Sequence, residues 1–104
     1  MITATDITAA VRAVEQEREV RTAEWEARTG RTRAFASTST IIAAADLAAR
    51  LGCSQRELRT AMAEHAGAVA SAIGARRVRY ERPANRITDS HPAQYVFERL
   101  LSVR

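Results

Sequence analysis

The sequence contains no lysine, a single cysteine and few aromatic residues. Aromatic side chains make up 5% of the 104 residues, and alanine supplies much of the 46% hydrophobic fraction, so we expect a thin core. All sixteen basic residues are arginine. This indicates mainly a GC-rich coding bias, and selection for bidentate contacts to phosphate and guanine is the weaker explanation. One cysteine cannot form an internal disulfide, which agrees with a reducing compartment.

No long hydrophobic run is present. The longest unbroken apolar stretch, Ile41 to Ala45, is far shorter than the roughly 20 residues that span a bilayer. The opening residues, MITATD, have neither a basic region nor a hydrophobic stretch, so we expect no secretory signal peptide. We predict a single cytoplasmic domain of residues 1–104 with no membrane partner.

Motifs for catalysis and for cofactor binding are also missing. The sequence has no GxGxxG or GxxxxGKS/T loop, and His65 and His91 have no Cys or acidic partner at metal-ligand spacing. We therefore expect no enzyme, no cofactor and no metal site. His65 has two interpretations, a phosphate contact and, more simply, a charge that complements a helix dipole. Cys53 is interpreted as a small buried side chain, with a reactive thiol as the alternative.

Residues 44–63, AADLAARLGCSQRELRTAMA, show the pattern of two helices joined by a tight turn. In the first helix Leu47, Ala48 and Leu51 fall on one face at helical spacing. Gly52 ends this helix, because glycine adopts the left-handed backbone that a helix end often requires. Ala48 is small where two steeply crossing helices approach each other closely.

The second helix begins with a predicted capping box of Ser54 and Glu57 and ends near Ala66 and Gly67. A further short turn of helix is expected at residues 69–73, closed by Gly74. The apolar residues of the second helix share one face and are expected to be buried: Leu58, Ala61 and Met62. Polar side chains at its start and on its opposite face are candidates for contacts in a DNA major groove: Ser54, Gln55, Arg56, Arg59 and Thr60.

This stretch resembles the helix-turn-helix of bacterial and phage winged-helix regulators in its apolar spacing, its small Ala48 and its turn residue Gly52. The resemblance covers about twenty residues well and the flanks more loosely. Two positions depart from the family pattern: Cys53 stands where an aliphatic residue is usual, and Ala61 is smaller than usual. The resemblance implies a winged helix-turn-helix that binds double-stranded DNA. The alternative is an ordinary helical hairpin in a small bundle.

The positive charge is concentrated after this stretch. Residues 71–104 contain seven arginines against Glu81, Asp89 and Glu98, which equals the whole formal charge of +4. Five of these arginines fall within eleven residues and are candidates for holding phosphates or entering the minor groove: Arg76, Arg77, Arg79, Arg82 and Arg86. The alternative is a solvated charge run that keeps a small protein soluble.

The N-terminal 30 residues predict a long charged helix. Thr3 and Asp6 form a possible capping box, and Gly30 is the expected stop. An apolar stripe runs as far as Val14, after which charged residues dominate. Trp25 lies in the charged half and has two interpretations, packing back on the core or anchoring a dimer partner or another protein.

The remaining elements complete the predicted fold. Residues 40–42 predict a short strand, and residues 78–81 predict a strand that returns through Ile87 and Thr88 after a turn at 83–85. Residues 91–104 predict a C-terminal helix with more large apolar residues than one face needs, so part of it is expected to pair with a second subunit. Three residues of this helix are candidates for that interface: Tyr95, Phe97 and Leu101. The alternative is simple burial against Ile7, Val11 and Val14.

The predicted fold class is mainly α with a small β-hairpin: a winged helix-turn-helix core at residues 40–90, preceded by the long helix and followed by the C-terminal helix. The first functional hypothesis is a DNA-binding homodimer, associated with the nucleoid, that regulates transcription or assists a phage-type DNA transaction. The second is a protein-interaction module in which the charged N-terminal helix binds or inhibits a protein partner. Substitution of Arg56 or Arg59, and salt-dependent retention on DNA, distinguish the two.

Overall fold

A computed structural model describes residues 1–32, 39–88 and 90–99. Within them, 58% of residues are helical and 24% lie in strands. The elements in chain order are α1 (Ala4–Thr29), β1 (Ser39–Ala43), α2 (Ala44–Leu51), α3 (Gln55–Ile73), β2 (Ala75–Glu81), β3 (Ala84–Asn85), β4 (Ser90–His91) and β5 (Gln94–Arg99). The fold is a mixed α/β arrangement with a three-stranded antiparallel sheet, so the prediction of a mainly helical fold with a small hairpin is wrong.

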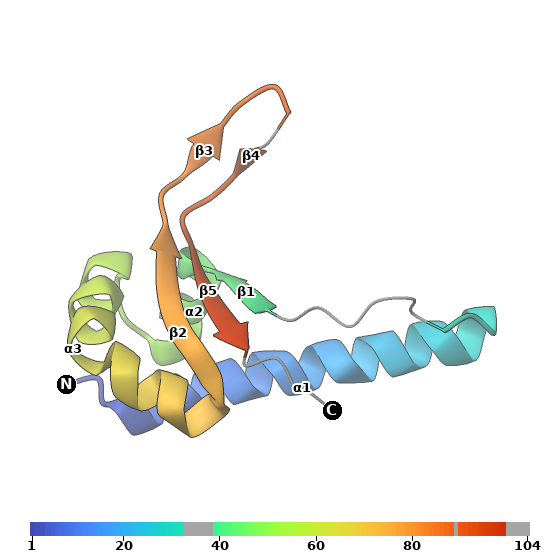
Figure 1. Cartoon of the computed structure of the whole chain (residues 1–104), viewed down its shortest axis with the longest axis horizontal. Helices are drawn as coiled ribbons and strands as arrows, with labels where there is room; N and C mark the ends of the chain where they lie inside the picture. The colour runs from blue at the N-terminus through green and yellow to red at the C-terminus, as the bar shows by residue number, and fades with distance from the viewer. Residues whose placement is uncertain (33–38, 89, 100–104) are drawn as a thin grey trace.

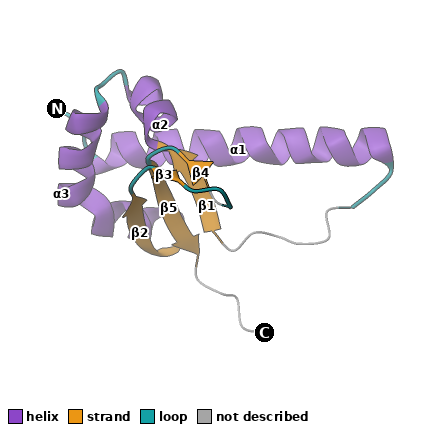
Figure 2. Cartoon of the chain, turned by 90° about the horizontal axis from the view of Figure 1, so that it is seen from above, coloured by secondary structure: helices purple, strands orange, loops and turns teal. Residues whose placement is uncertain are grey.

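The sheet has the order β1-β5-β2, with β5 in the centre. Ile42 of β1 lies opposite Tyr95 of β5, and Tyr80 of β2 lies opposite the same residue on the other side. Beyond the sheet, β2 and β5 continue as a hairpin whose outer part is the short β3–β4 ribbon. Figure 1 shows this ribbon projecting away from α1, and Figure 2 shows the helices on one side of the sheet.

The predicted C-terminal helix is replaced by strand β5 in its described part. Tyr95 and Phe97 belong to the core that the helices cover, and Val96, between them, is buried on the opposite face. A central strand covered on both faces has a continuous apolar run, which periodicity cannot distinguish from a buried helix segment. The aromatic and β-branched character of residues 95–97 favours a strand. Residues 100–104 lie outside the described residues.

The buried residues of helix α1 in the described part of the chain all lie in its N-terminal half. Its caps are the predicted ones: Thr3 and Asp6 form a capping box, and Gly30 closes the helix in a left-handed conformation. Its buried residues end at Val14. A helix of 26 residues is about 39 Å long, close to the longest dimension of the molecule, 44 Å. In both views its C-terminal half extends beyond the other elements (Figures 1 and 2).

Glu15 connects the last packed turn of α1 to two strands. Its carboxylate accepts a hydrogen bond from the Thr40 hydroxyl at 2.7 Å and forms an ion pair with Arg99. Arg99 also donates to the carbonyl of Ile73 at the end of α3. The Glu15 carboxylate and the Arg99 guanidinium thus link α1, β1, β5 and the end of α3.

Helices α2 and α3 form at the positions predicted for the two-helix motif. Gly52 has φ 67°, a backbone conformation that a side chain would strain, and Ser54 and Glu57 make both bonds of a capping box. Contrary to prediction, α3 does not end near Ala66 but continues to Ile73. Gly67 is tolerated inside the helix because the buried face resumes at Val69, Ala70 and Ile73.

The hairpin also differs from the prediction at its turn. Strand β2 was expected and is present, but Ile87 and Thr88 form no return strand. Ala84 and Asn85 pair with His91 and Ser90, so the chain reverses later than expected. Pro83, Ala84 and Asn85 form a turn pattern in the sequence, but Ala84 and Asn85 are paired in the ribbon instead. In the parts of the chain that the structure describes, no helix is both long and apolar enough to span a membrane.

Candidate nucleic-acid interface

The start of α3 presents a polar, solvent-facing surface. Gln55, Arg56 and Thr60 are exposed, and the Thr60 hydroxyl donates to the Arg56 carbonyl at 3.2 Å. Ser54 is partly committed to the helix end, because its hydroxyl oxygen accepts a bond from the Glu57 N–H at 3.1 Å. Of the predicted groove residues, the side chains of Gln55 and Arg56 therefore face solvent without a bond to another described side chain.

Arg59 lies against the hairpin. Its guanidinium carbon is 4.2 Å from the centre of the Tyr80 ring, within the range of a cation–π interaction. The Tyr80 ring in turn lies 5.2 Å from the Tyr95 ring at a tilt of 58°. We call Arg59, Tyr80 and Tyr95 the aromatic stack. It runs from the core to the surface at the angle between α3 and β2, and it gives Arg59 a fixed position there.

Tyr95 is the buried end of the aromatic stack. Its side chain is 2% exposed, and its hydroxyl has no hydrogen-bond partner among the residues described. Burial raises the pKa of Tyr95 above its ordinary value of 10.0, with a smaller contribution from Tyr80. The hydroxyl therefore stays neutral at physiological pH and acts as part of a hydrophobic support for Tyr80.

Two of the five candidate hairpin arginines are neutralised by neighbouring acids at the base of the hairpin. Arg77 makes a bidentate contact with Glu98, with N···O distances of 2.6 and 3.1 Å. Arg79 bridges Glu98 at 3.1 Å and Glu81 at 2.7 Å. The hydrogen bond from Arg77 holds the pKa of Glu98 below its ordinary value, and bonds from Gln94 and Arg79 do the same for the pKa of Glu81.

The other three candidates, Arg76, Arg82 and Arg86, are exposed and form no ion pair with a described residue. Arg76 lies at the start of β2, at the end of the hairpin beside α1 (Figure 1). Arg82 is six residues further, about 20 Å along an extended strand. Arg82 and Arg86 flank the β3 strand of the projecting ribbon. The cationic part of the hairpin is therefore its tip, where the sequence also contains Asp89.

The start of α3 and the hairpin tip lie on the same side of the molecule. In Figure 1 the N-terminal turns of α3 and the β3–β4 ribbon both point away from α1, while the C-terminal end of α3 approaches it. The Arg12 guanidinium donates to the Ala72 carbonyl at 2.6 Å, which fixes that end of α3 on α1. The start of α3 and the hairpin tip, which both carry exposed arginines, therefore lie on one side of the molecule, and Arg59 contacts β2 through Tyr80.

The candidate partner residues are separated by the structure. Tyr95 and Phe97 are 2% and 0% exposed, so they are core residues and not part of an interface, because the predicted helix surface that carried them does not form. Leu101 lies outside the described residues. Trp25 is 38% exposed on the projecting half of α1. Among the three candidates that the structure describes, Trp25 is the one whose side chain is exposed enough for a partner contact.

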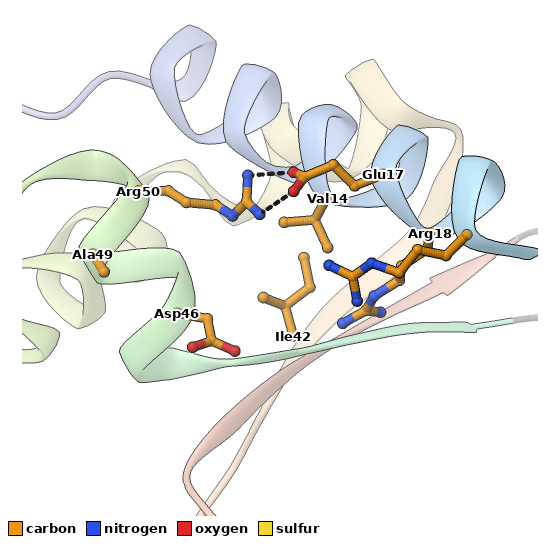
Figure 3. Close-up of a pocket in the computed structure, with 8 residues that line it drawn as sticks. Val14, Glu17, Arg18, Ile42, Asp46, Ala49 and Arg50 are labelled. Atoms are coloured by element: carbon orange, nitrogen blue, oxygen red, sulfur yellow. Dashed lines mark hydrogen bonds and ion pairs between the residues drawn. The ribbon is translucent and has the colours of Figure 1, made fainter.

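A groove of about 500 Å³ lies between α1, β1 and α2. Figure 3 shows Arg50 paired with Glu17 on one wall and Val14 and Ile42 at the floor, with N···O distances in the pair of 2.6 and 2.9 Å. The remaining lining residues are Arg18, Arg21, Asp46 and Ala49. The groove contains no Ser, Cys, Thr or His, so its described lining offers no nucleophile with a base. The Arg50–Glu17 ion pair in this groove holds α2 against α1.

Other candidate chemistry is limited in the described residues. Cys53 is partly buried, and burial raises the pKa of its thiol, with a further contribution from Glu57. A raised pKa disfavours the nucleophilic thiolate. His65 lies 3.9 Å from the Glu64 carboxylate. Across residues 1–32, 39–88 and 90–99, no three metal-binding side chains lie together.

Comparisons with protein-family models, with curated proteins and with solved structures found no match to this chain.

Sequence reasoning missed three residues of this surface. Tyr80 alternates with Arg79 and Glu81, which indicated a half-buried side chain but not its contact with Arg59. Glu98 fell in a segment assigned to a helix, so its pairing with Arg77 and Arg79 was not foreseen. Ile87 was placed in a strand, although it lies exposed at the tip.

Proposed function

We propose that this chain is a winged helix-turn-helix protein that binds duplex DNA. The observation that supports this most is the position of two exposed cationic elements on one side of the molecule: the start of α3 and the β3–β4 tip. The order of the elements also supports it, because strand β1, helices α2 and α3 and a long hairpin follow one another along the chain. The strands β1, β5 and β2 form one antiparallel sheet. Helix α3 would lie in the major groove, with the hairpin as the wing.

The proposed contacts divide into base reading and backbone binding. Gln55 and Arg56 are free to reach base edges, where Arg pairs with guanine and Gln with adenine. Arg59 is held against Tyr80, so its proposed partner is a phosphate at the edge of the groove. Stacking on an aromatic face leaves the N–H groups of the guanidinium plane available for an oxygen pair.

The electrostatic part of binding is assigned mainly to Arg82 and Arg86 at the tip. Guanidiniums that already share carboxylates, as in Arg77 and Arg79, release fewer counterions when they approach phosphate. Arg76 carries the same charge without a described partner but lies about 20 Å from Arg82 along the strand. Arg76 is therefore a matched control for the tip arginines.

The experiment is selection of bound fragments from a random pool of duplex DNA, followed by titration of the selected duplex at several salt concentrations. We expect an enriched site and an affinity that falls with salt. Arg56→Ala should lose about 1–3 kcal/mol on the selected site and little on random duplex, whereas Arg76→Ala should change neither. Absence of salt-dependent binding to any duplex contradicts the proposal.

We further propose that the DNA-binding form is a dimer, located with the nucleoid, and that it regulates transcription or assists a phage-type DNA transaction. Winged-helix regulators commonly read paired half-sites, so a palindromic selected site would support the dimer. Sedimentation of the protein alone and on the selected duplex tests it. A monomer with a single half-site contradicts it.

A second candidate function, binding of a protein partner through α1, is favoured by one observation. The projecting half of α1 exposes Trp25 and also Val20, which is 50% exposed. Removing residues 1–30 does not test this candidate, because Ile7 and Val11 are core residues. Trp25→Glu is the appropriate variant, with Ala27→Glu as the control on the same exposed helix. Loss of a cellular partner with Trp25→Glu but not with Ala27→Glu would support it, and equal retention by both variants would contradict it.

A further inference from the structure

Ile87 at the hairpin tip is the most exposed large apolar residue apart from the terminal Met1 in the described chain. Its relative exposure is 106%, so its side chain is fully in water. Every other described isoleucine is at least half covered, and Ile7, Ile42 and Ile73 belong to the core. Nothing in the fold of the described residues uses the Ile87 side chain.

Ile87 lies next to an arginine, on a ribbon that projects from the sheet. Arg86 precedes it, and Arg82 lies on the same ribbon; neither forms an ion pair with a described residue. The ribbon is fixed by the pairs Ala84–His91 and Asn85–Ser90 and projects from the sheet (Figure 1). Ile87 thus stands fully exposed at the end of a narrow ribbon, directly after Arg86 and two residues before Asp89 in the sequence.

This combination matches the minor groove of DNA better than a protein surface. The narrow groove has an enhanced negative potential that attracts arginine. Proteins that bind there frequently insert one apolar side chain between neighbouring base pairs, which partly unstacks them and kinks the duplex. β-ribbons are among the elements that reach the grooves in this way.

We propose that Ile87 is an apolar wedge that enters a base-pair step from the minor groove and bends the duplex, an activity that rests on the DNA binding proposed above. Arg82 and Arg86 hold the phosphates on either side of the opened step. The protein then shapes DNA as well as reading it, and flexible pyrimidine–purine steps under the tip are favoured.

The test uses the selected duplex labelled with a donor and an acceptor dye at its ends, and a second copy with 2-aminopurine at the step under the tip. Bound wild-type protein should increase energy transfer, corresponding to a kink of about 20–90°, and raise the 2-aminopurine fluorescence by unstacking. Ile87→Ser should lose most of both changes while still binding. Ile87→Leu should retain them, and Thr88→Ala, a change at the neighbouring exposed position, serves as the control.

Equal bending and equal 2-aminopurine fluorescence for wild type and Ile87→Ser would overturn the wedge. Binding without any bend would overturn it as well while leaving the DNA-binding function intact. If the wild-type protein shows no salt-dependent binding to duplex DNA, the proposed function fails and the wedge with it. A duplex with a mismatch at the step should be bound more tightly than the matched duplex by wild type, and this preference should disappear in Ile87→Ser.

Discussion

The base and the tip of the same hairpin have opposite characters. At the base, β5 supplies Tyr95 and Phe97 to the core, and Arg77 and Arg79 of β2 are paired with Glu81 and Glu98. At the tip each strand of the ribbon is two residues long. Ile87 is exposed there, and Arg82 and Arg86 form no ion pair with a described residue. A run of arginines that looks uniform in the sequence is thus divided between folding and the proposed binding.

The largest effect should come from removing the apolar base. Phe97 is fully buried in the central strand, so Phe97→Ala should lower the free energy of unfolding by about 3–5 kcal/mol through lost burial and an unfilled cavity. Small domains are stable by only about 5–15 kcal/mol, so the variant should be near unfolding at physiological temperature. Urea titration followed by circular dichroism measures this. A loss below about 1 kcal/mol would mean that β5 is not the centre of the sheet.

The tip should behave in the opposite way. Changing Arg82 and Arg86 together to Gln should leave the free energy of unfolding within about 0.5 kcal/mol, because neither side chain makes an ion pair with a described residue. The slope of log affinity for DNA against log salt should fall by about two. Fluorescence anisotropy at four or five salt concentrations measures the slope, and Arg76→Gln is the control that should keep it. An equal decrease of the salt slope in Arg76→Gln would show that the arginines at the tip and at the base do not differ in DNA binding.

The boundary between base and tip is the aromatic stack. Tyr80→Phe keeps the ring under Arg59 and should leave DNA affinity unchanged, whereas Tyr80→Leu should weaken binding by about 0.5–1 kcal/mol. In the Arg59→Ala background the Tyr80→Leu substitution should have no further effect on binding, because its target is already absent. Full additivity of the two substitutions would show that Tyr80 does not position Arg59.

The smallest effect concerns the paired arginines at the base. The Arg77 bond lowers the pKa of Glu98 in the folded protein relative to its ordinary value of 4.5. Its contribution to stability is therefore complete above about pH 4.5 and is lost as the pH falls through the lowered folded value. Wild type and Glu98→Gln should differ in urea midpoint at pH 7 and converge near pH 3. A difference that is the same at both pH values would exclude the ion pair as its cause.

Local patterns in the sequence predicted the caps of α1, the end of α2 and the start of α3 correctly, because these end signals are local. Thr3, Ser54 and the glycines at 30 and 52 determine caps through neighbours within four residues, and the structure has caps at these positions. The sheet was missed because β5 depends on partners far away in the chain. Residues 95–97 are buried in a strand because β1 and β2 flank β5 and helices cover one face of the sheet. No short window of the sequence contains these distant partners.

The interface was predicted only in outline for the same reason. The exposed positions of α3 follow from helical periodicity, so Gln55 and Arg56 could be assigned from the sequence. The state of each hairpin arginine depends on the residue across the strand pair, as for Arg77 and Glu98. The net charge of a segment therefore overestimated the number of guanidiniums that are available to a polyanion.

The central position of β5 also has a consequence for how the chain folds. β5 follows every other described element along the chain, yet both β1 and β2 pair with it and with no other strand of the three-stranded sheet. During synthesis the two outer strands therefore have no sheet partner until about residue 99 has left the ribosome. The three-stranded sheet therefore forms only after β5 is available, and the edges of β1 and β2 are exposed and at risk of aggregation until this strand pairs between them.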